Sequence, residues 1–224
     1  MEVHLRFGWI KARLNYHNFI VENTSILSPP LVPEITLHLA HEALPIWQKT
    51  EDELEQIGLP PPFWAFAWAG GQALARYILD NPELVRGKRV VDIASGSGLV
   101  AIAAMKAGAH SVLAADIDKF SEAAMQVNSE LNGVQISITT QDLLMNPAED
   151  FDVILVGDLF YEKTIAEKCF AWLQQAKAET ILIGDPGRSY LPKDKLIKIV
   201  TYAVPVSRDL EDSEIKQSAV WKLA

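Results

Sequence analysis

A glycine-rich turn between an apolar stretch and a helical one constrains the fold more than any other feature of the sequence. Residues 89–93 (RVVDI) are typical of a buried strand, 94–98 (ASGSG) form the turn, and 99–107 are typical of a helix that ends at Gly108. A strand that turns directly into a helix begins a βαβ unit, whose crossover is right-handed. The turn therefore predicts an α/β fold.

The chain after residue 70 continues this alternation. Because such an order brings successive strands side by side, it predicts a mostly parallel, Rossmann-like sheet covered by helices on both faces. Residues 196–202 fit a helix or a strand, and 213–223 contain a final strand. Ligands of such sheets bind at the carboxyl ends of the strands, so functional residues should directly follow them. The other expected elements are helices at 71–80, 119–131 and 164–175, and strands at 111–115, 135–140, 151–156 and 180–184.

The first sixty residues differ in composition from the rest. Prolines at positions 29, 30, 33, 45 and 60 to 62 interrupt regular structure there. We predict an N-terminal helical arm at 1–60 that lies on a main domain at 61–224. The arm is a candidate cover for a substrate groove.

Charge and composition exclude several classes of function. The 224 residues carry a formal net charge of −9, whereas a protein that holds nucleic acid by its phosphates needs a basic face. No apolar run approaches the roughly 18 residues of a membrane helix. The single cysteine, Cys169, and the lack of an apolar secretory segment indicate a cytoplasmic protein. His38 and His41 have no third ligand nearby, so no metal site is expected.

The glycine turn fits two kinds of nucleotide cofactor. Gly96, Gly98 and Ala101 match the dinucleotide fingerprint G-x-G-x-x-G/A, which is a weak signal when it stands alone. Glycines let the backbone approach a ligand, and the helix N-terminus offers unpaired N–H groups. Asp116 ends the next strand, twenty residues after Gly96, where a carboxylate can bind ribose hydroxyls. NAD and S-adenosylmethionine (SAM) both carry such a ribose.

Asp92 separates these two cofactors. Its carboxylate precedes the glycines, where it would repel the pyrophosphate of NAD and attract the ammonium and sulfonium of SAM. This position favours SAM. A third strand-end carboxylate, Asp142, is placed to meet the adenine amino group. The alternative is structural: a turn formed for packing, Asp116 or Asp118 as a helix cap, and Asp142 as a turn or cap residue.

Asp158 and Tyr161 follow the fourth strand, where the methyl group of bound SAM would lie. Asp158 offers an acceptor that can hold an amine, and Tyr161 an aromatic wall that excludes water, so both are candidate catalytic residues. The alternative is a helix cap at Asp158, with Phe160 or Tyr161 in the core. The chain lacks the Asn/Asp-Pro-Pro-aromatic turn that is common in enzymes methylating the amino groups of bases.

Taken together, these motifs resemble a known class of enzyme, the class I SAM-dependent methyltransferases, and in particular their protein-lysine branch. Stretches 62–82 and 183–188 are similar to the lysine methyltransferases of the electron transfer flavoprotein β subunit. The resemblance implies a seven-strand sheet with an antiparallel last strand, SAM as methyl donor, and lysine side chains of that flavoprotein subunit as substrate. The motifs that carry the class likeness are Asp92-x-Ala94-x-Gly96-x-Gly98, Asp116 and Asp158-x-x-Tyr161.

The resemblance also implies roles beside the cofactor. Trp68 would pack on SAM, and the backbone of Gly71 would approach its methionine carboxylate. Asp185 and Arg188 either line the substrate entrance or form a turn with an ion pair. Ala94 stands where the class pattern has its first glycine, which alanine allows unless φ is positive there. Three alternatives stay open: a ribosomal protein as substrate, a small-molecule amine as substrate, and a binding module without activity.

Overall fold

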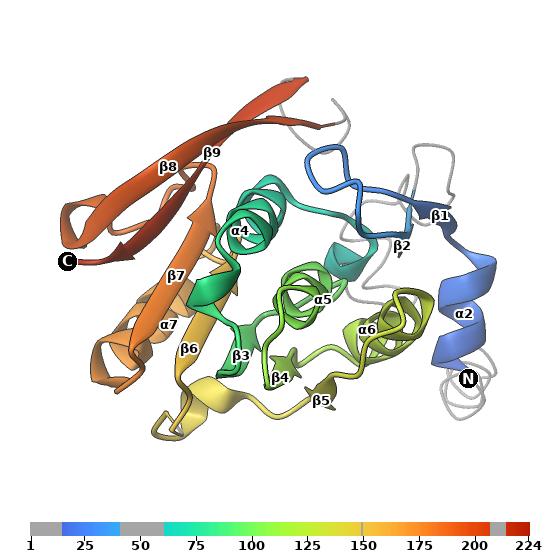
Figure 1. Ribbon diagram of the computed structural model, residues 1–224, viewed down its shortest axis with the longest axis horizontal. Helices are drawn as coiled ribbons and strands as arrows, with labels where there is room; N and C mark the ends of the chain where they lie inside the picture. Colours follow the sequence, from blue (N-terminus) through green and yellow to red (C-terminus); the bar gives the residue numbers. More distant parts are fainter. Residues whose placement is uncertain (1–14, 41–60, 149, 207–213) are drawn as a thin grey trace, which may run out of the picture.

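A seven-stranded sheet forms the centre of the molecule, with its strands in the order β5-β4-β3-β6-β7-β9-β8 (Figure 1). The computed structural model describes residues 15–40, 61–148, 150–206 and 214–224. The strands of this sheet are β3 (Arg89–Ile93), β4 (Ser111–Ala115), β5 (Ser137–Thr139), β6 (Val153–Gly157), β7 (Thr180–Asp185), β8 (Leu196–Pro205) and β9 (Ile215–Leu223).

The directions of the strands confirm the predicted fold class. β5, β4, β3, β6 and β7 pair in parallel, and β9 pairs antiparallel with both β7 and β8. The last strand in sequence is therefore the antiparallel one, inserted between β7 and β8. Residues 196–202, which fitted either a helix or a strand, lie in β8.

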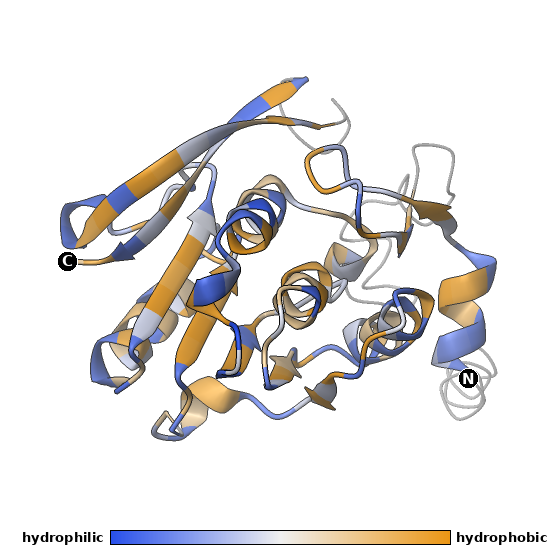
Figure 2. Ribbon diagram, in the orientation of Figure 1, coloured by the Kyte–Doolittle hydropathy of each residue, from blue (hydrophilic) through white to orange (hydrophobic). Residues whose placement is uncertain are grey.

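Helices cover both faces of this sheet. Residues of α4 and α5 share one core cluster with Val90, whereas residues of α7 share the other with Val91. Adjacent residues of a strand point to opposite faces, so a strand buried on both sides is apolar at nearly every position. Figure 2 shows this continuous apolar character along the central strands. The helices are α4 (Ala69–Asp80), α5 (Leu99–Lys106), α6 (Lys119–Leu131) and α7 (Lys163–Gln175), with 3-10 turns η1 (Phe63–Ala65), η2 (Pro82–Leu84), η3 (Leu143–Met145) and η4 (Lys193–Lys195).

The described part of the arm, residues 15–40, packs against the main domain. It contains α2 (Tyr16–Glu22) and a hairpin of β1 (Ser25–Leu27) and β2 (Leu37–Leu39), and the sequence did not predict this hairpin. The ring of Phe120 on α6 lies 4.9 Å from Tyr16 and 5.1 Å from Phe19, centroid to centroid. The division at residue 60 and the groove-covering role stay predictions. Within the described ranges, no helix has the length and apolarity needed to cross a membrane.

Candidate functional site

The glycine turn after β3 is built from left-handed backbone. Gly96 has φ +55° and Gly98, which caps α5, has φ +84°. Glycine adopts these angles without the steric cost that a Cβ brings. Ala94 also has a positive φ, +54°. The sequence allowed alanine in place of the first glycine of the class pattern unless φ is positive there, and in the structure it is positive. A left-handed alanine costs roughly 1–2 kcal/mol, and the turn therefore carries strain at Ala94.

Asp92 holds this turn against α5. Its side chain is buried, and Oδ2 accepts hydrogen bonds from the Ser95 hydroxyl at 2.5 Å and the Ala101 N–H at 3.1 Å. Burial raises the pKa of Asp92 to about 7, although the hydrogen bonds from Ser95 and Ala101 lower it, and the charge of Asp116 makes a smaller upward contribution. Such a carboxylate is stabilised in its charged form by a nearby cation. Its role toward a cofactor stays a prediction.

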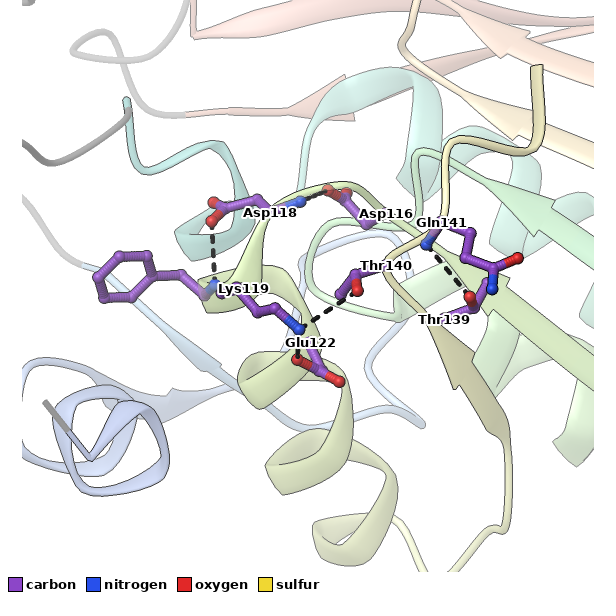
Figure 3. A network of polar contacts seen from close by, with 8 residues as sticks. Asp116, Asp118, Lys119, Glu122, Thr139, Thr140 and Gln141 are labelled. Atoms are coloured by element: carbon purple, nitrogen blue, oxygen red, sulfur yellow. Dashed lines mark hydrogen bonds and ion pairs between the residues drawn. The ribbon is translucent and has the colours of Figure 1, made fainter. Parts of the chain in front are cut away.

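Asp116 joins β4 to the same turn. Oδ2 accepts the N–H of Gly96 at 2.9 Å. Figure 3 shows the second contact, in which Oδ1 accepts the N–H of Asp118 at 3.0 Å. Burial raises the pKa of Asp116. Asp118, and not Asp116, caps α6 by accepting the N–H of Phe120 at 3.0 Å. Asp116 therefore lies at the strand end where the sequence placed it, and it is not the helix cap.

A network of side chains next to Asp116 links α6 to the segment after β5 (Figure 3). Lys119 Nζ on α6 lies 3.0 Å from Glu122 Oε2 and 3.3 Å from Thr140 Oγ1. The hydroxyl of Thr139 accepts the N–H of Gln141 at 3.2 Å. These contacts hold Gln141 and the following residues at the pocket described next.

A pocket of about 250 Å³ opens at the carboxyl ends of the parallel strands. Asp142 takes the structural alternative there: Oδ1 accepts the N–H of Leu144 at 3.0 Å and caps η3, while Oδ2 pairs with Lys168 Nζ at 2.6 Å. Its role toward an adenine amino group stays a prediction. A mostly apolar lining with a few convergent polar groups is typical of small-ligand sites. The lining residues are Ile93, Ala94, Ala115, Asp116, Ile117, Gln141, Asp142, Leu143, Leu144, Leu159, Glu162, Thr164, Ile165 and Lys168.

Asp158 sits at the end of β6 with its carboxylate buried. Its backbone is left-handed, with φ +56°, and its N–H donates to the Gly184 carbonyl at 2.8 Å. Oδ2 accepts the N–H of Gly70 at 2.8 Å, and Oδ1 accepts Nε–H of Arg188 at 2.6 Å. Glu162 supplies the cap of α7, so the helix-cap alternative for Asp158 is excluded.

Three aromatic side chains form a connected cluster beside the Asp158–Arg188 pair, and we call Phe63, Trp68 and Tyr161 the aromatic rim. The Phe63 ring lies 5.5 Å from that of Tyr161 and 6.1 Å from that of Trp68, centroid to centroid. Tyr161 is 45% exposed, whereas Phe160 is fully buried, so Phe160 is the core residue of the two. Burial, and then the charges of nearby carboxylates, raise the pKa of Tyr161.

The structure thus brings the predicted residues together in two neighbouring groups. Asp116 and Asp142 line the pocket, and Asp92, Gly96 and Gly98 form the turn beside it. Asp158, Tyr161 and Trp68 form the second group. A Cβ added to Gly71 would lie 3.9 Å from Val100 and 4.0 Å from Leu99 on α5, and the role of Gly71 toward a cofactor stays a prediction.

Sequence reasoning missed two parts of this site. Gly70, rather than Gly71, binds Asp158, and Lys168 on α7 holds Asp142 across 26 positions of sequence. The Gly70-Gly71 pair was a visible signal for the first contact, but no local pattern marks Lys168. For Asp185 and Arg188, the turn is present, since Asp185 accepts the backbone N–H of Arg188, but the side chain of Arg188 pairs with Asp158 and not with Asp185.

The strand order with its antiparallel β9, the glycine turn after β3 and the carboxylates after β4 and β6 define a class I, Rossmann-like methyltransferase. A family model described as ribosomal protein L11 methyltransferase (PrmA) matches residues 72–160. The electron transfer flavoprotein beta subunit lysine methyltransferase of Mus musculus is 38% identical over 212 residues, covering 91% of this chain and 82% of the mouse protein. The chain therefore belongs to the family of electron transfer flavoprotein β subunit lysine methyltransferases, and it is a methyltransferase enzyme.

Solved structures support the fold. The Thermoplasma acidophilum protein 1320 matches with a TM-score of 0.52 and 17% identity, covering 68% of this chain and 88% of that one. The Pyrococcus abyssi tRNA (uracil-54, C5)-methyltransferase, solved with S-adenosyl-L-homocysteine (SAH), matches with a TM-score of 0.50 and 19% identity. It covers 67% of this chain and 38% of that one.

Proposed function

We propose that this enzyme transfers methyl groups from SAM to lysine side chains of the electron transfer flavoprotein β subunit. The observation that carries the proposal is the buried Asp158 carboxylate at the end of β6, near the aromatic rim, in which Phe63 and Tyr161 are exposed. Support for the substrate comes from the relatives, which match over 91% of the chain, whereas the ribosomal-protein methyltransferase model matches residues 72–160 alone.

The pocket and the glycine turn fit SAM. Asp116 would accept hydrogen bonds from the ribose hydroxyls, and Asp142 from the adenine amino group, within a lining that is otherwise mostly apolar. Asp92, with its raised pKa, suits a site that receives a cationic ligand. Gly96, Gly98 and Gly71 would allow close backbone approach. Trp68 would cover the methionine end.

SAM supplies a methyl group already activated on a sulfonium, so the chain contributes alignment and electrostatics. Asp158 would accept a hydrogen bond from the lysine amine. This bond would orient the lone pair of the lysine nitrogen toward the methyl group. Tyr161 would close the slot against water together with the rest of the aromatic rim. A free lysine has a pKa of about 10.4, so it must lose a proton before it attacks.

The exposure of the rim favours a protein side chain over a small molecule as substrate. Phe63 is 41% exposed and Tyr161 45%, which is typical of an open slot and not of a closed pocket. Cys169 is fully buried on α7, and burial raises the pKa of its thiol to about 12, so it is no nucleophile. A cytoplasmic location is part of the same proposal and rests on this single unpaired cysteine.

The decisive experiment incubates the purified enzyme with tritiated SAM and the purified flavoprotein β subunit, and then maps labelled lysines. Asp158→Asn should lower transfer at least about a hundredfold, because the amide offers a weaker acceptor in a site built for a carboxylate. Asn tolerates left-handed backbone, so the variant should fold. Asp116→Ala is the matched control: it should weaken SAH binding, measured by calorimetry, about tenfold or more, through lost hydrogen bonds.

Two results would contradict the proposal. The first is label found in small metabolites and in no protein lysine. The second is an Asp158→Asn variant that loses SAH affinity and transfer equally, which would place Asp158 in cofactor binding.

A further inference from the structure

Arg188 binds the same carboxylate that the proposed function assigns to the substrate amine. Its Nε–H donates to Asp158 Oδ1 at 2.6 Å, and its guanidinium lies 5.8 Å from the centre of the Trp68 ring. The side chain of Arg188 is 21% exposed, and that of Asp158 is 4% exposed. Salt and water screen such a buried pair weakly, so Arg188 controls the charge that Asp158 presents.

The turn after β7 places Arg188 at this position. Asp185 Oδ1 accepts the N–H of Gly187 at 2.6 Å and the N–H of Arg188 at 2.7 Å. The N–H of Tyr190 then donates to the Phe160 carbonyl at 3.2 Å, which ties the end of the turn to the loop after β6. The backbone of Arg188 is therefore fixed beside Asp158.

Besides Arg188 and Lys193, whose Nζ would lie 3.4 Å from a Cβ added to Gly187, the described titratable groups near this place are acidic. Asp185 at the end of β7 is fully buried, and burial, followed by the charge of Asp158, raises its pKa to about 6. Tyr161 faces the slot after β6, and Asp116, Glu162 and Asp158 lie near enough to raise its pKa in addition to burial. Helix α4 contributes the N–H of Gly70. Each of these carboxylates favours a bound ammonium over a bound amine.

A lysine that accepts a methyl group must be a neutral amine, so its surroundings must favour the amine over the ammonium. An isolated buried carboxylate would stabilise the lysine as an ammonium, which has no lone pair for attack. A neighbouring cation reverses this preference and makes a lysine nucleophilic near neutral pH.

We propose that Arg188 is a positioning residue for methyl transfer: it cancels the charge of Asp158, so that the carboxylate accepts a hydrogen bond from a neutral lysine amine without holding it as an ammonium. The inference rests on the proposed function. The ammonium proton leaves to water before the attack. The nitrogen lone pair then forms the N–C bond, while the C–S bond breaks and its electron pair stays on sulfur.

The test measures kcat for the flavoprotein β subunit against pH in wild type, Arg188→Gln and Arg188→Lys. With Gln, the midpoint of the rise in kcat should move up by about one pH unit or more, because one unit corresponds to about tenfold in rate on the acidic side. The loss of kcat that Arg188→Gln shows at neutral pH should disappear at alkaline pH. KM should stay level or fall, since the ammonium binds a charged Asp158 more tightly. Lys, which keeps the charge, should restore most of the neutral-pH rate.

The control is SAH affinity measured by calorimetry. It should be unchanged in both variants, which would show that the fold and the cofactor site are intact. A kcat that falls equally at every pH would overturn the inference and leave Arg188 a structural role. A kcat/KM that rises at every pH would also overturn it, because Arg188 would then be a plug in the lysine slot. No label on any protein lysine with wild-type enzyme would instead overturn the proposed function, and the inference with it.

Discussion

At the scale of single residues, Asp92 makes the stability of the glycine turn depend on pH. In the unfolded chain an aspartate titrates near 3.9, whereas burial raises the pKa of Asp92 in the folded protein to about 7. Between these two values the folded state holds a proton that the unfolded state lacks. The free energy of unfolding therefore falls as pH rises through this window, and it stays lower above pH 7.

Asp92→Asn should remove this pH dependence. Both hydrogen bonds to Asp92 end on Oδ2, so the amide oxygen can accept both from Ser95 and Ala101. Without SAM, the variant should match wild type near pH 5 and exceed its free energy of unfolding near pH 8 by on the order of 2 kcal/mol. Urea denaturation at several pH values measures this. A stability difference that is the same at every pH would show that Asp92 does not titrate in this range.

At the scale of elements, two glycines set the distance between α4 and β7. A Cβ added to Gly70 would overlap the carbonyl oxygen of Gly184, and a Cβ added to Gly184 would overlap that of Gly70. This close approach is what brings the Gly70 N–H to Asp158. The packing of α4 on β7 and the geometry of the candidate catalytic carboxylate therefore depend on the same contact.

Gly70→Ala should push α4 away from β7, because the clash involves backbone that cannot move alone. We expect it to cost about 2 kcal/mol or more, which lowers the melting temperature by roughly 4–8 °C for a chain of this size. Gly71→Ala is the matched control, because a Cβ there meets Val100 and Leu99 at ordinary contact distances of 3.9 and 4.0 Å. It should be neutral or slightly stabilising. Equal melting temperatures for the two variants would contradict this account.

Periodicity along the chain predicts most elements but not their partners. The helix at 119–131 matches α6 residue for residue, since apolar spacing and the following Asn132-Gly133 are both local signals. The β1–β2 hairpin was missed, because three-residue strands are too short to show an alternating pattern. The strand-end carboxylates were visible, whereas the partners of Asp158 and Asp142 come from distant elements. Such contacts depend on the fold and leave no local pattern.

At the scale of the whole molecule, the net charge of −9 bears on how the proposed lysine substrate approaches the enzyme. A surface that presents a lysine is often locally positive, and an acidic enzyme would attract it over distances comparable to the Debye length. Such attraction acts on the rate of encounter more than on the bound complex. It should therefore affect kcat/KM for the protein substrate and leave kcat nearly unchanged.

Raising NaCl from about 0.01 to about 0.1 M shortens the Debye length from ~30 to ~10 Å, and this should lower kcat/KM for the flavoprotein β subunit several-fold. The kcat should change less than about twofold over the same range, because the Asp158–Arg188 pair beside the proposed transfer is largely buried and salt screens it weakly. The matched control is SAH affinity, measured at the same salt concentrations, since SAH carries no net charge at neutral pH. A kcat/KM that rises with salt would mean that the two surfaces repel, and that apolar contacts with the aromatic rim guide docking in place of long-range charge.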